Sequence, residues 1–310
     1  MGLQVSHQVQ LSRYVKVYII NNNNGGNCMS YHNYANSKYV FLLGNGINNK
    51  SNVRINWESI LKNIGEEYGV KYVNGFPLTA FMELLTIYTL DNTDHKLKDT
   101  FIKKVEMISG SSDHREIYEF CNKNHIDILT TNFDHAIQKT NNLEKTSTRS
   151  LKKGFTDFYP WQIYYKRAGS NIKLFHINGD IEYKRSIKLS VKDYAGNITR
   201  FNNLYRPSAA KSKYKIDKTW INVMFEKELV ILGLGLGEDE LFLRHLLIER
   251  QIYRKKNKLN KNDGINGYYL YRKKSLPRYS NKYARYEFFF KSVGIEMKDY
   301  DDYSLMYKMQ

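Results

Sequence analysis

Cysteines are scarce in this chain and long apolar runs are absent, and each shortage excludes a class of protein. Only Cys28 and Cys121 occur among the 310 residues, and they lie far apart. Two isolated cysteines form neither a disulfide framework nor a four-cysteine zinc module, which favours a reducing cytoplasm. The first 20 residues lack a secretion signal, and no apolar run reaches the roughly 18 residues of a membrane helix. The sequence therefore predicts a cytoplasmic protein without a membrane segment.

Acidic residues are outnumbered by basic ones, 31 against 48, which gives a formal net charge of +17. Basic clusters attract nucleic-acid phosphates, so a DNA-associated protein is one alternative. However, Asn, Lys, Ile and Tyr are abundant throughout, as an AT-rich genome would impose, and the densest basic segments, 254–261 and 272–274, follow a predicted helix and a predicted strand. We interpret most of this charge as solvated surface, with any nucleic-acid contact indirect.

The chain divides into a polar N-terminal segment and one folded body. Residues 1–37 contain the Asn21–Asn24 tract followed by two glycines, a composition that predicts a flexible extension or an assembly segment. Residues 38–310 suffice for one large α/β domain with a substantial core, or one such domain with a small accessory layer. We therefore predict a single domain over 38–310.

Apolar, strand-like runs alternate with helical patterns in this domain. Strands are predicted at 39–44, 126–131, 172–177, 186–191, 228–235, 267–272 and near Ile295. Helices are predicted at 57–69, 77–90, 97–109, 115–124, 217–226, 238–253 and 283–294. The alternation predicts an α/β fold with a doubly wound, mostly parallel, Rossmann-like sheet and helices on both faces.

Short motifs rich in Gly, Asn, His or Asp follow four of these strands. They are Gly44-Asn45-Gly46, Thr131-Asn132-Phe133-Asp134, His176-Ile177-Asn178-Gly179-Asp180 and Gly233-Leu234-Gly235. In an open parallel sheet, ligands bind just outside the carboxyl ends of the strands. The four motifs therefore predict one nucleotide-sized pocket.

The first glycine motif lies between a strand and a helix, where backbone N–H groups can approach a pyrophosphate. The third glycine of a dinucleotide fingerprint is missing, since Asn49 occupies its position, and the later acids Glu66 and Glu67 fall inside a helical pattern. A hydride-transfer dehydrogenase is therefore disfavoured. A tight strand-to-helix turn remains an equal alternative for this motif.

Three polar side chains in the other motifs are candidates for chemistry. Asn132 can donate and accept hydrogen bonds at once, and Asp134 can accept from a ribose hydroxyl or orient a partner. For this pair the alternative is a helix N-cap with an acid in the first turn. His176 suits proton removal because its ordinary pKa is near neutrality, and its alternative is a hydrogen-bonded core histidine.

Taken together, in this order and spacing, these segments resemble the sirtuin superfamily, specifically the bacterial sirtuin-like NAD hydrolases of anti-phage defence. The resemblance covers about residues 38–300. The matching segments are Gly44 to Asn48 with Trp57 after them, Thr130 to Asp134 for the T-x-N-x-D motif, His176 to Gly179 for the His-Gly segment, and Gly233 to Leu236 for the late G-x-S-L strand end.

The resemblance implies that residues 38–310 form an NAD-binding catalytic domain, an NAD glycohydrolase that cleaves the nicotinamide N-glycosidic bond and depletes NAD in abortive infection. The implied catalytic residues are Asn132, Asp134 and His176. The implied NAD-binding residues are Gly44, Asn45, Gly46, Asn48, Thr131, Asn178, Gly233, Leu234 and Gly235. No metal, zinc or cofactor beyond NAD itself is expected, and control is expected from a homo-oligomer or from a partner ATPase or sensor chain.

One departure from the family pattern bears on catalysis. Family members place the catalytic histidine directly before the glycine, and here that position is Asn178, with His176 two residues upstream. Loss of the base would leave a sensor that binds NAD or ADP-ribose without cleaving it, and this is the main alternative. The DNA-associated protein is the other.

Overall fold

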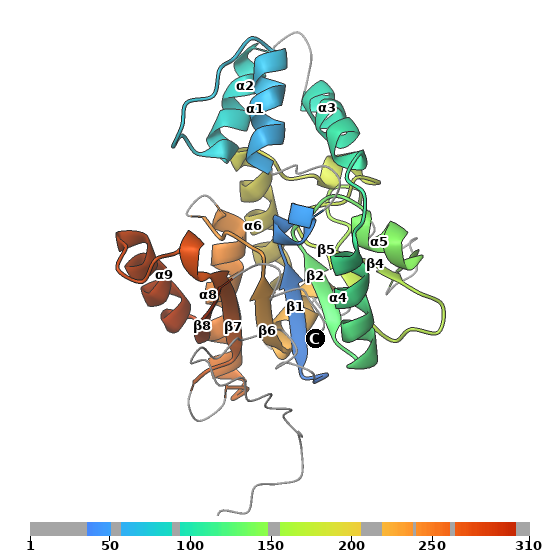
Figure 1. Cartoon of the computed structure of the whole chain (residues 1–310), viewed down its shortest axis with the longest axis vertical. Helices are drawn as coiled ribbons and strands as arrows, with labels where there is room; N and C mark the ends of the chain where they lie inside the picture. Colours follow the sequence, from blue (N-terminus) through green and yellow to red (C-terminus); the bar gives the residue numbers. More distant parts are fainter. Residues whose placement is uncertain are drawn as a thin grey trace, which may run out of the picture.

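The computed structural model describes residues 36–50, 57–88, 94–147, 156–205, 219–237, 240–260 and 264–301 (Figure 1). Nearly all of the expected N-terminal extension, residues 1–37, lies outside these ranges, so its role stays a prediction. Among the described residues, no helix combines the length and apolarity needed to span a bilayer.

Eight strands of the described chain form one mixed sheet. Their bounds are β1 (Tyr39–Leu43), β2 (Asp127–Thr130), β3 (Glu144–Ser147), β4 (Ile163–Lys166), β5 (Leu174–His176), β6 (Glu228–Leu232), β7 (Gly267–Arg272) and β8 (Ile295–Tyr300). The strand order is β3-β4-β5-β2-β1-β6-β7-β8. In this order the strands β5, β2, β1, β6, β7 and β8 pair in parallel with one another. Only β3 and β4, at one edge, run antiparallel to their neighbours. The predicted mostly parallel α/β sheet is confirmed.

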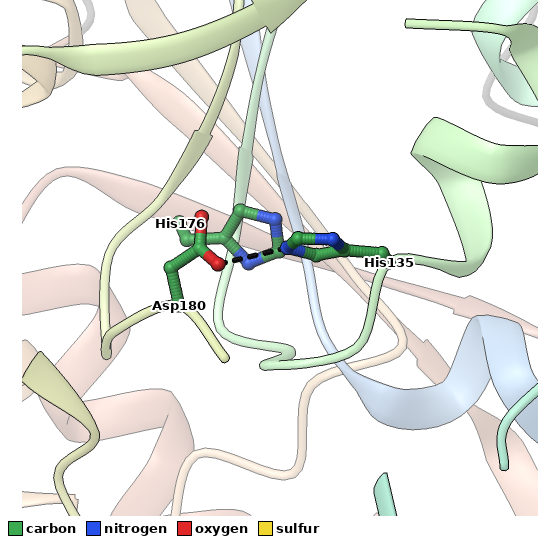
Figure 2. Close-up of side chains that lie close together, drawn as sticks. All are labelled: His135, His176 and Asp180. Atoms are coloured by element: carbon green, nitrogen blue, oxygen red, sulfur yellow. Dashed lines mark hydrogen bonds and ion pairs between the residues drawn. The ribbon is translucent and has the colours of Figure 1, made fainter. Parts of the chain in front are cut away.

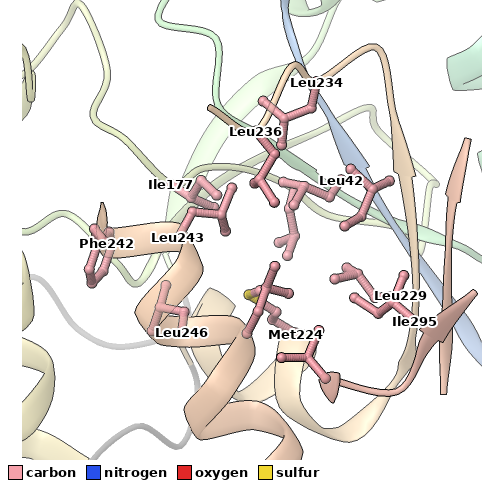
Figure 3. Packing of buried hydrophobic residues seen from close by; sticks show 14 of the residues in the cluster. Leu42, Ile177, Met224, Leu229, Leu234, Leu236, Phe242, Leu243, Leu246 and Ile295 are labelled. Atoms are coloured by element: carbon pink, nitrogen blue, oxygen red, sulfur yellow. The ribbon is translucent and has the colours of Figure 1, made fainter. Parts of the chain in front are cut away.

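Helices cover both faces of this sheet (Figure 1). The α-helices are α1 (Trp57–Glu67), α2 (Leu78–Tyr88), α3 (Asp94–Glu106), α4 (Ser112–Lys123), α5 (Ala136–Asn141), α6 (Val191–Tyr205), α7 (Trp220–Glu226), α8 (Leu241–Lys256) and α9 (Asn281–Ser292), and the 3₁₀ turns are η2 (Asn45–Lys50), η3 (Lys184–Ser186) and η4 (Lys273–Ser275). Because side chains alternate along a strand, Phe41 packs toward α4 and α5, whereas Leu42 packs toward α7 and α8 (Figure 3).

A separate helical cap, made of α1, α2 and α3, lies above the carboxyl ends of the strands (Figure 1). Its own apolar cluster includes Ile64, Phe81 and Phe101. Residues from the sheet side also join that cluster and hold the cap over the strand ends, namely Phe133, Ala136, Ile187 and Leu189. The cap therefore covers any ligand that binds at the carboxyl ends of the strands.

The strand predicted at 186–191 is wrong. After η3 the chain runs without a ladder partner into α6, whose first turn is capped by Asp193 and Ser190. The Asp193 carboxylate accepts from the Leu189 and Ser190 amides, and the Ser190 hydroxyl accepts from the Asp193 amide. This reciprocal S-x-x-D capping begins a helix where apolar alternation suggested a strand.

Candidate functional site

A cavity of about 250 Å³ lies at the carboxyl ends of β1, β2, β5 and β6, under the helical cap. Half of the predicted site residues line it, namely Asn45, Thr131, Asn178, Gly233, Leu234 and Gly235. Leu61 and Phe101 of the cap close it from above, and Lys188 and Leu189 form another wall. Strand ends that are far apart in the sequence therefore meet at one site.

The two glycine motifs pack directly against each other beside this cavity. The Gly44 amide donates to the Leu232 carbonyl and the Gly46 amide donates to the Gly233 carbonyl, each at 2.8 Å. A Cβ on Gly44 or Gly46 would lie within 2.7 Å of Gly233 backbone atoms. These positions need glycine because two backbone turns meet there. Their N–H groups are already paired, so in this conformation they do not face a pyrophosphate.

Asn132 begins the turn after β2, and it lies between the lining residues Thr131 and Phe133 without itself being one of the residues that line the cavity. Its side-chain nitrogen lies 3.4 Å from the Gly44 carbonyl oxygen, a long hydrogen bond. Among the described residues its Oδ1 has no hydrogen-bond partner although it is buried, and the same holds for Oδ1 of Asn178. Unpaired buried amide oxygens are costly, and they suggest that a ligand supplies the missing donors.

Asp134 connects α5 with Asn48 through the two oxygens of its carboxylate. One carboxylate oxygen accepts from the Ala136 amide at 3.0 Å, which starts α5, and the other accepts from Asn48 Nδ2 at 2.9 Å. The same Asn48 nitrogen also donates to Asn45 Oδ1 at 2.7 Å. The alternative interpretation, a helix N-cap with an acid in the first turn, is wrong in detail, because the N-cap of α5 is His135 and the first turn of α5 contains no acidic residue. Asp134 precedes the N-cap, supports the start of α5 through the Ala136 amide, and orients Asn45 by way of Asn48.

His114 of α4 completes this network, and no sequence motif had singled it out. Its Nε2 lies 2.8 Å from Asn48 Oδ1, while its Nδ1 accepts from the Ser111 amide at 3.0 Å. Burial lowers the pKa of His114, against the opposing charges of Asp134 and Asp113. The His114 ring is thus a neutral donor that fixes the Asn48 amide. Its only sequence signal was the S-x-x-H spacing at the start of a helix.

His176 lies at the end of β5 but is not among the residues that line the cavity. Its Nδ1 donates to the Asn132 carbonyl at 2.6 Å, and its Nε2 is hydrogen-bonded to the Gln138 side chain. Burial lowers the pKa of His176, although Asp180 nearby acts to raise it. The geometry makes His176 a neutral support for the Asn132 backbone.

A second cluster joins His176, His135 and Asp180 (Figure 2). His135 Nε2 donates to Asp180 Oδ1 at 2.8 Å, and the Tyr165 hydroxyl donates to Asp180 Oδ2 at 2.6 Å. Burial alone would raise the pKa of Asp180, but His176 and the hydrogen bonds from His135 and Tyr165 lower it below its ordinary range. The ligand atoms of the three lie within 4.8 Å of one another, and each residue already has a protein partner. This network holds the loop after β5 against α5.

The loop after β5 turns sharply at Gly179, whose φ is +118°. A Cβ there would lie 2.3 Å from the Ser186 carbonyl oxygen. Beyond the turn, the Lys188 amide donates to the Asn178 carbonyl at 3.1 Å. Gly179 thus lets the chain double back and places the Asn178 and Lys188 side chains on the same cavity.

We expect acidification to destabilise the fold because His114 and His176 are buried as neutral rings. In the unfolded chain these histidines take up protons below about pH 6.5, whereas burial keeps them unprotonated to lower pH in the folded state. The free energy of unfolding should therefore fall by up to about 1.4 kcal/mol per histidine for each pH unit below about 6.5. Thermal melts at pH 7.5 and 5.5 would measure the change.

A matched pair of variants tests the source of this slope. His176→Asn keeps a donor for the Asn132 carbonyl but does not titrate, so its stability should depend less on pH than that of the wild type. His125→Asn makes the same change at an exposed histidine whose φ of 56° suits asparagine, and it should keep the wild-type slope. Equal slopes for His176→Asn and wild type would contradict the assignment.

Comparison with known proteins identifies a family for this chain. A family model described as the SIR2-like domain matches residues 127–291, which is more than half of the chain. The matched segment contains the ends of β2, β5 and β6 but begins after the Gly44 motif and the helical cap. No curated protein matches the chain.

Proposed function

The chain belongs to the SIR2-like domain family, whose members are NAD-dependent enzymes, and on that basis we propose that it hydrolyses NAD. The bond that breaks is the N-glycosidic bond between nicotinamide and ribose. The products are nicotinamide and ADP-ribose or a cyclised form of it.

The unpaired side-chain oxygens of Asn132 and Asn178 are the observation that carries this proposal. A ligand rich in hydroxyl donors, such as a ribose, would pair both oxygens and remove the cost of burying them unpaired. Apolar side chains such as Phe133 and Phe101 line the same cavity and suit the flat nicotinamide ring. The residues present therefore fit the nicotinamide riboside end of NAD.

The other end of NAD has a matching place nearby. A smaller cavity of about 120 Å³ shares Gly233, Leu234 and Gly235 with the first and extends to the aromatic residues Tyr271 and Tyr286. An extended dinucleotide would lie across the Gly233 turn, with its adenosine in the smaller cavity. This arrangement follows the general placement of nucleotides at the carboxyl ends of parallel strands.

Cleavage of this bond passes through an oxocarbenium-like state, so positioning and electrostatics supply much of the rate. Asn132 would hold the nicotinamide ribose and a water molecule through its free oxygen. Asp134 and His176 would act through their neighbours, because the first orients Asn45 by way of Asn48 and the second supports the Asn132 backbone. We assign both to positioning.

A sensor that binds NAD or ADP-ribose without cleaving it is the second candidate. It is favoured by Asn178, a neutral amide that lines the cavity where the family pattern has its histidine base.

An NAD hydrolase active without control would harm its own cell. We therefore also propose that activity depends on self-assembly or on a partner chain, with NAD depletion in anti-phage defence as the biological outcome.

Incubating the purified protein with NAD and following nicotinamide by chromatography would test the function. We expect nicotinamide to accumulate in proportion to protein, and calorimetry should show NAD binding under the same conditions. Binding without nicotinamide release, also in assembled protein, would favour the sensor. If the protein neither binds NAD nor releases nicotinamide, that result would contradict both candidates.

A further inference from the structure

Lys188 lies between two cavities. The first is the cavity of about 250 Å³ under the helical cap, called the NAD cavity from here on, and the second is larger. The second cavity has a volume of about 650 Å³ and is lined mainly by residues of α2, α3, η3 and α6 and of the segment before α6. Lys188 and Leu189 line both cavities. The Lys188 residue is only 4% exposed, so its amine is buried in the wall that the two cavities share.

The Lys188 amine has weak partners for a buried cation. Its Nζ lies 3.4 Å from the Arg185 carbonyl oxygen and 4.9 Å from the centre of the Tyr159 ring. Within the described part of the chain, no carboxylate reaches ion-pair distance of this nitrogen. The nearby Asp193 carboxylate pairs with Lys98 at 2.9 Å instead. Burial consequently lowers the pKa of Lys188 to about 8, so a sizeable share of the amine is neutral near pH 7.5.

Few other groups around the NAD cavity can take up a proton near neutral pH. Asn178 carries an amide, which does not titrate, and His176 lies outside the lining with both ring nitrogens paired. The remaining titratable lining residues are Tyr194 and Glu240. Glu240 lies at the start of α8 beside the Gly233 turn, on a different element from the Asn178 and Lys188 pair.

We propose that the neutral amine of Lys188 accepts a proton from the attacking water when NAD is cleaved, an assignment that rests on the proposed hydrolase function. The water oxygen forms a bond to the anomeric carbon as the bond to nicotinamide breaks, and the electron pair of that bond neutralises the pyridinium ring. One water proton moves to Lys188 Nζ. The resulting ammonium ion then returns its proton to solvent through the second cavity.

Backbone geometry supports this role. The hydrogen bond from the Lys188 amide to the Asn178 carbonyl holds the two residues side by side, and both residues line the NAD cavity. Asn178 can hold the water or a ribose hydroxyl through its unpaired oxygen while Lys188 takes the proton. Two residues would then divide the work that a single histidine performs in the family pattern.

Three variants test the assignment by nicotinamide release. Lys188→Arg keeps a cation but cannot accept a proton, and Lys188→Met keeps only the apolar stem. Both should lower kcat by about 10²-fold or more with KM changed only a few-fold. The wild-type rate should rise with pH through about 8, and this rise should disappear in both variants. Lys192→Met alters an exposed lysine that lines the second cavity alone and should behave as wild type.

The outcomes separate this inference from the proposed function. Full turnover in Lys188→Arg together with a raised KM in Lys188→Met would show that Lys188 binds an anionic group of the substrate, and would overturn its role as proton acceptor. Wild-type kcat in a folded Lys188→Met would also overturn it, while leaving NAD hydrolysis intact. Absence of nicotinamide release from the wild type itself would instead refute the hydrolase function, and the Lys188 role with it.

Discussion

Replacing Asn132 with alanine should lower nicotinamide release by at least about 10²-fold and leave the melting temperature nearly unchanged. The side chain makes one long hydrogen bond to the Gly44 carbonyl, and its oxygen has no partner among the described residues. Its loss therefore removes little that stabilises the fold. If Asn132 positions ribose and water, its loss removes the geometry on which cleavage depends. Chromatography of nicotinamide and a thermal melt of the same sample would measure both effects.

Asn197 offers the matched control for this variant. It is a fully buried asparagine of α6 whose side-chain atoms have no hydrogen-bond partner in the described structure, and unlike Asn132 it has no sequence neighbour that lines the NAD cavity. Asn197→Ala should keep full activity. Activity within a few-fold of wild type in Asn132→Ala would contradict the central assignment. A large fall in melting temperature with proportionate loss of activity would indicate a purely structural role instead.

Gly179→Ala should destabilise the protein by more than about 3 kcal/mol and abolish activity with it. The residue has a φ of +118°, which L-residues rarely adopt, and an added Cβ would overlap the Ser186 carbonyl group. Relief of this overlap would move Asn178 or Lys188 away from the cavity. Denaturant unfolding of the two proteins would give the change in free energy.

Gly169→Ala separates the steric effect from the backbone effect. Gly169 also has a positive φ, +75°, but nothing lies within 4 Å of its added Cβ. Its alanine variant should lose only about 1–2 kcal/mol and keep its activity. Equal losses at positions 169 and 179 would show that contact with Ser186 is unimportant for the turn after β5.

The sheet could be predicted from sequence where its strands are apolar on both faces. β1 and β6 are buried at every position, and continuous runs such as YVFLL and ELVIL are typical of central parallel strands. The edge strand β3 and its neighbour β4 were not predicted, because they are short and partly exposed, with charged ends such as Glu144 and Lys166. Lys188 was missed for a related reason. It lies in the segment predicted as a strand at 186–191, whereas the structure has no strand there and pairs the Lys188 amide with the Asn178 carbonyl instead.

The location of the site could be predicted from the sequence more readily than the side-chain contacts within it. The ends of β1, β2, β5 and β6 meet at one cavity because parallel strands share an edge. Which nitrogen of His176 is paired, and that Asp134 reaches Asn45 through Asn48, depend on packing between segments far apart in the chain. The S-x-x-H spacing around His114 indicates only a helix start, and it does not reveal the contact with Asn48, which lies 66 positions away in the chain.

The central position of β1 also constrains how the polypeptide folds as it is synthesised. β1 lies between β2 and β6, yet residues 228–232 of β6 leave the ribosome long after β1 and β2. Until then β1 has an open, wholly apolar edge, which is a template for intermolecular pairing. A nascent chain or proteolytic fragment that stops before β6 would therefore be prone to aggregation, and chaperone binding to it should persist until β6 has been translated.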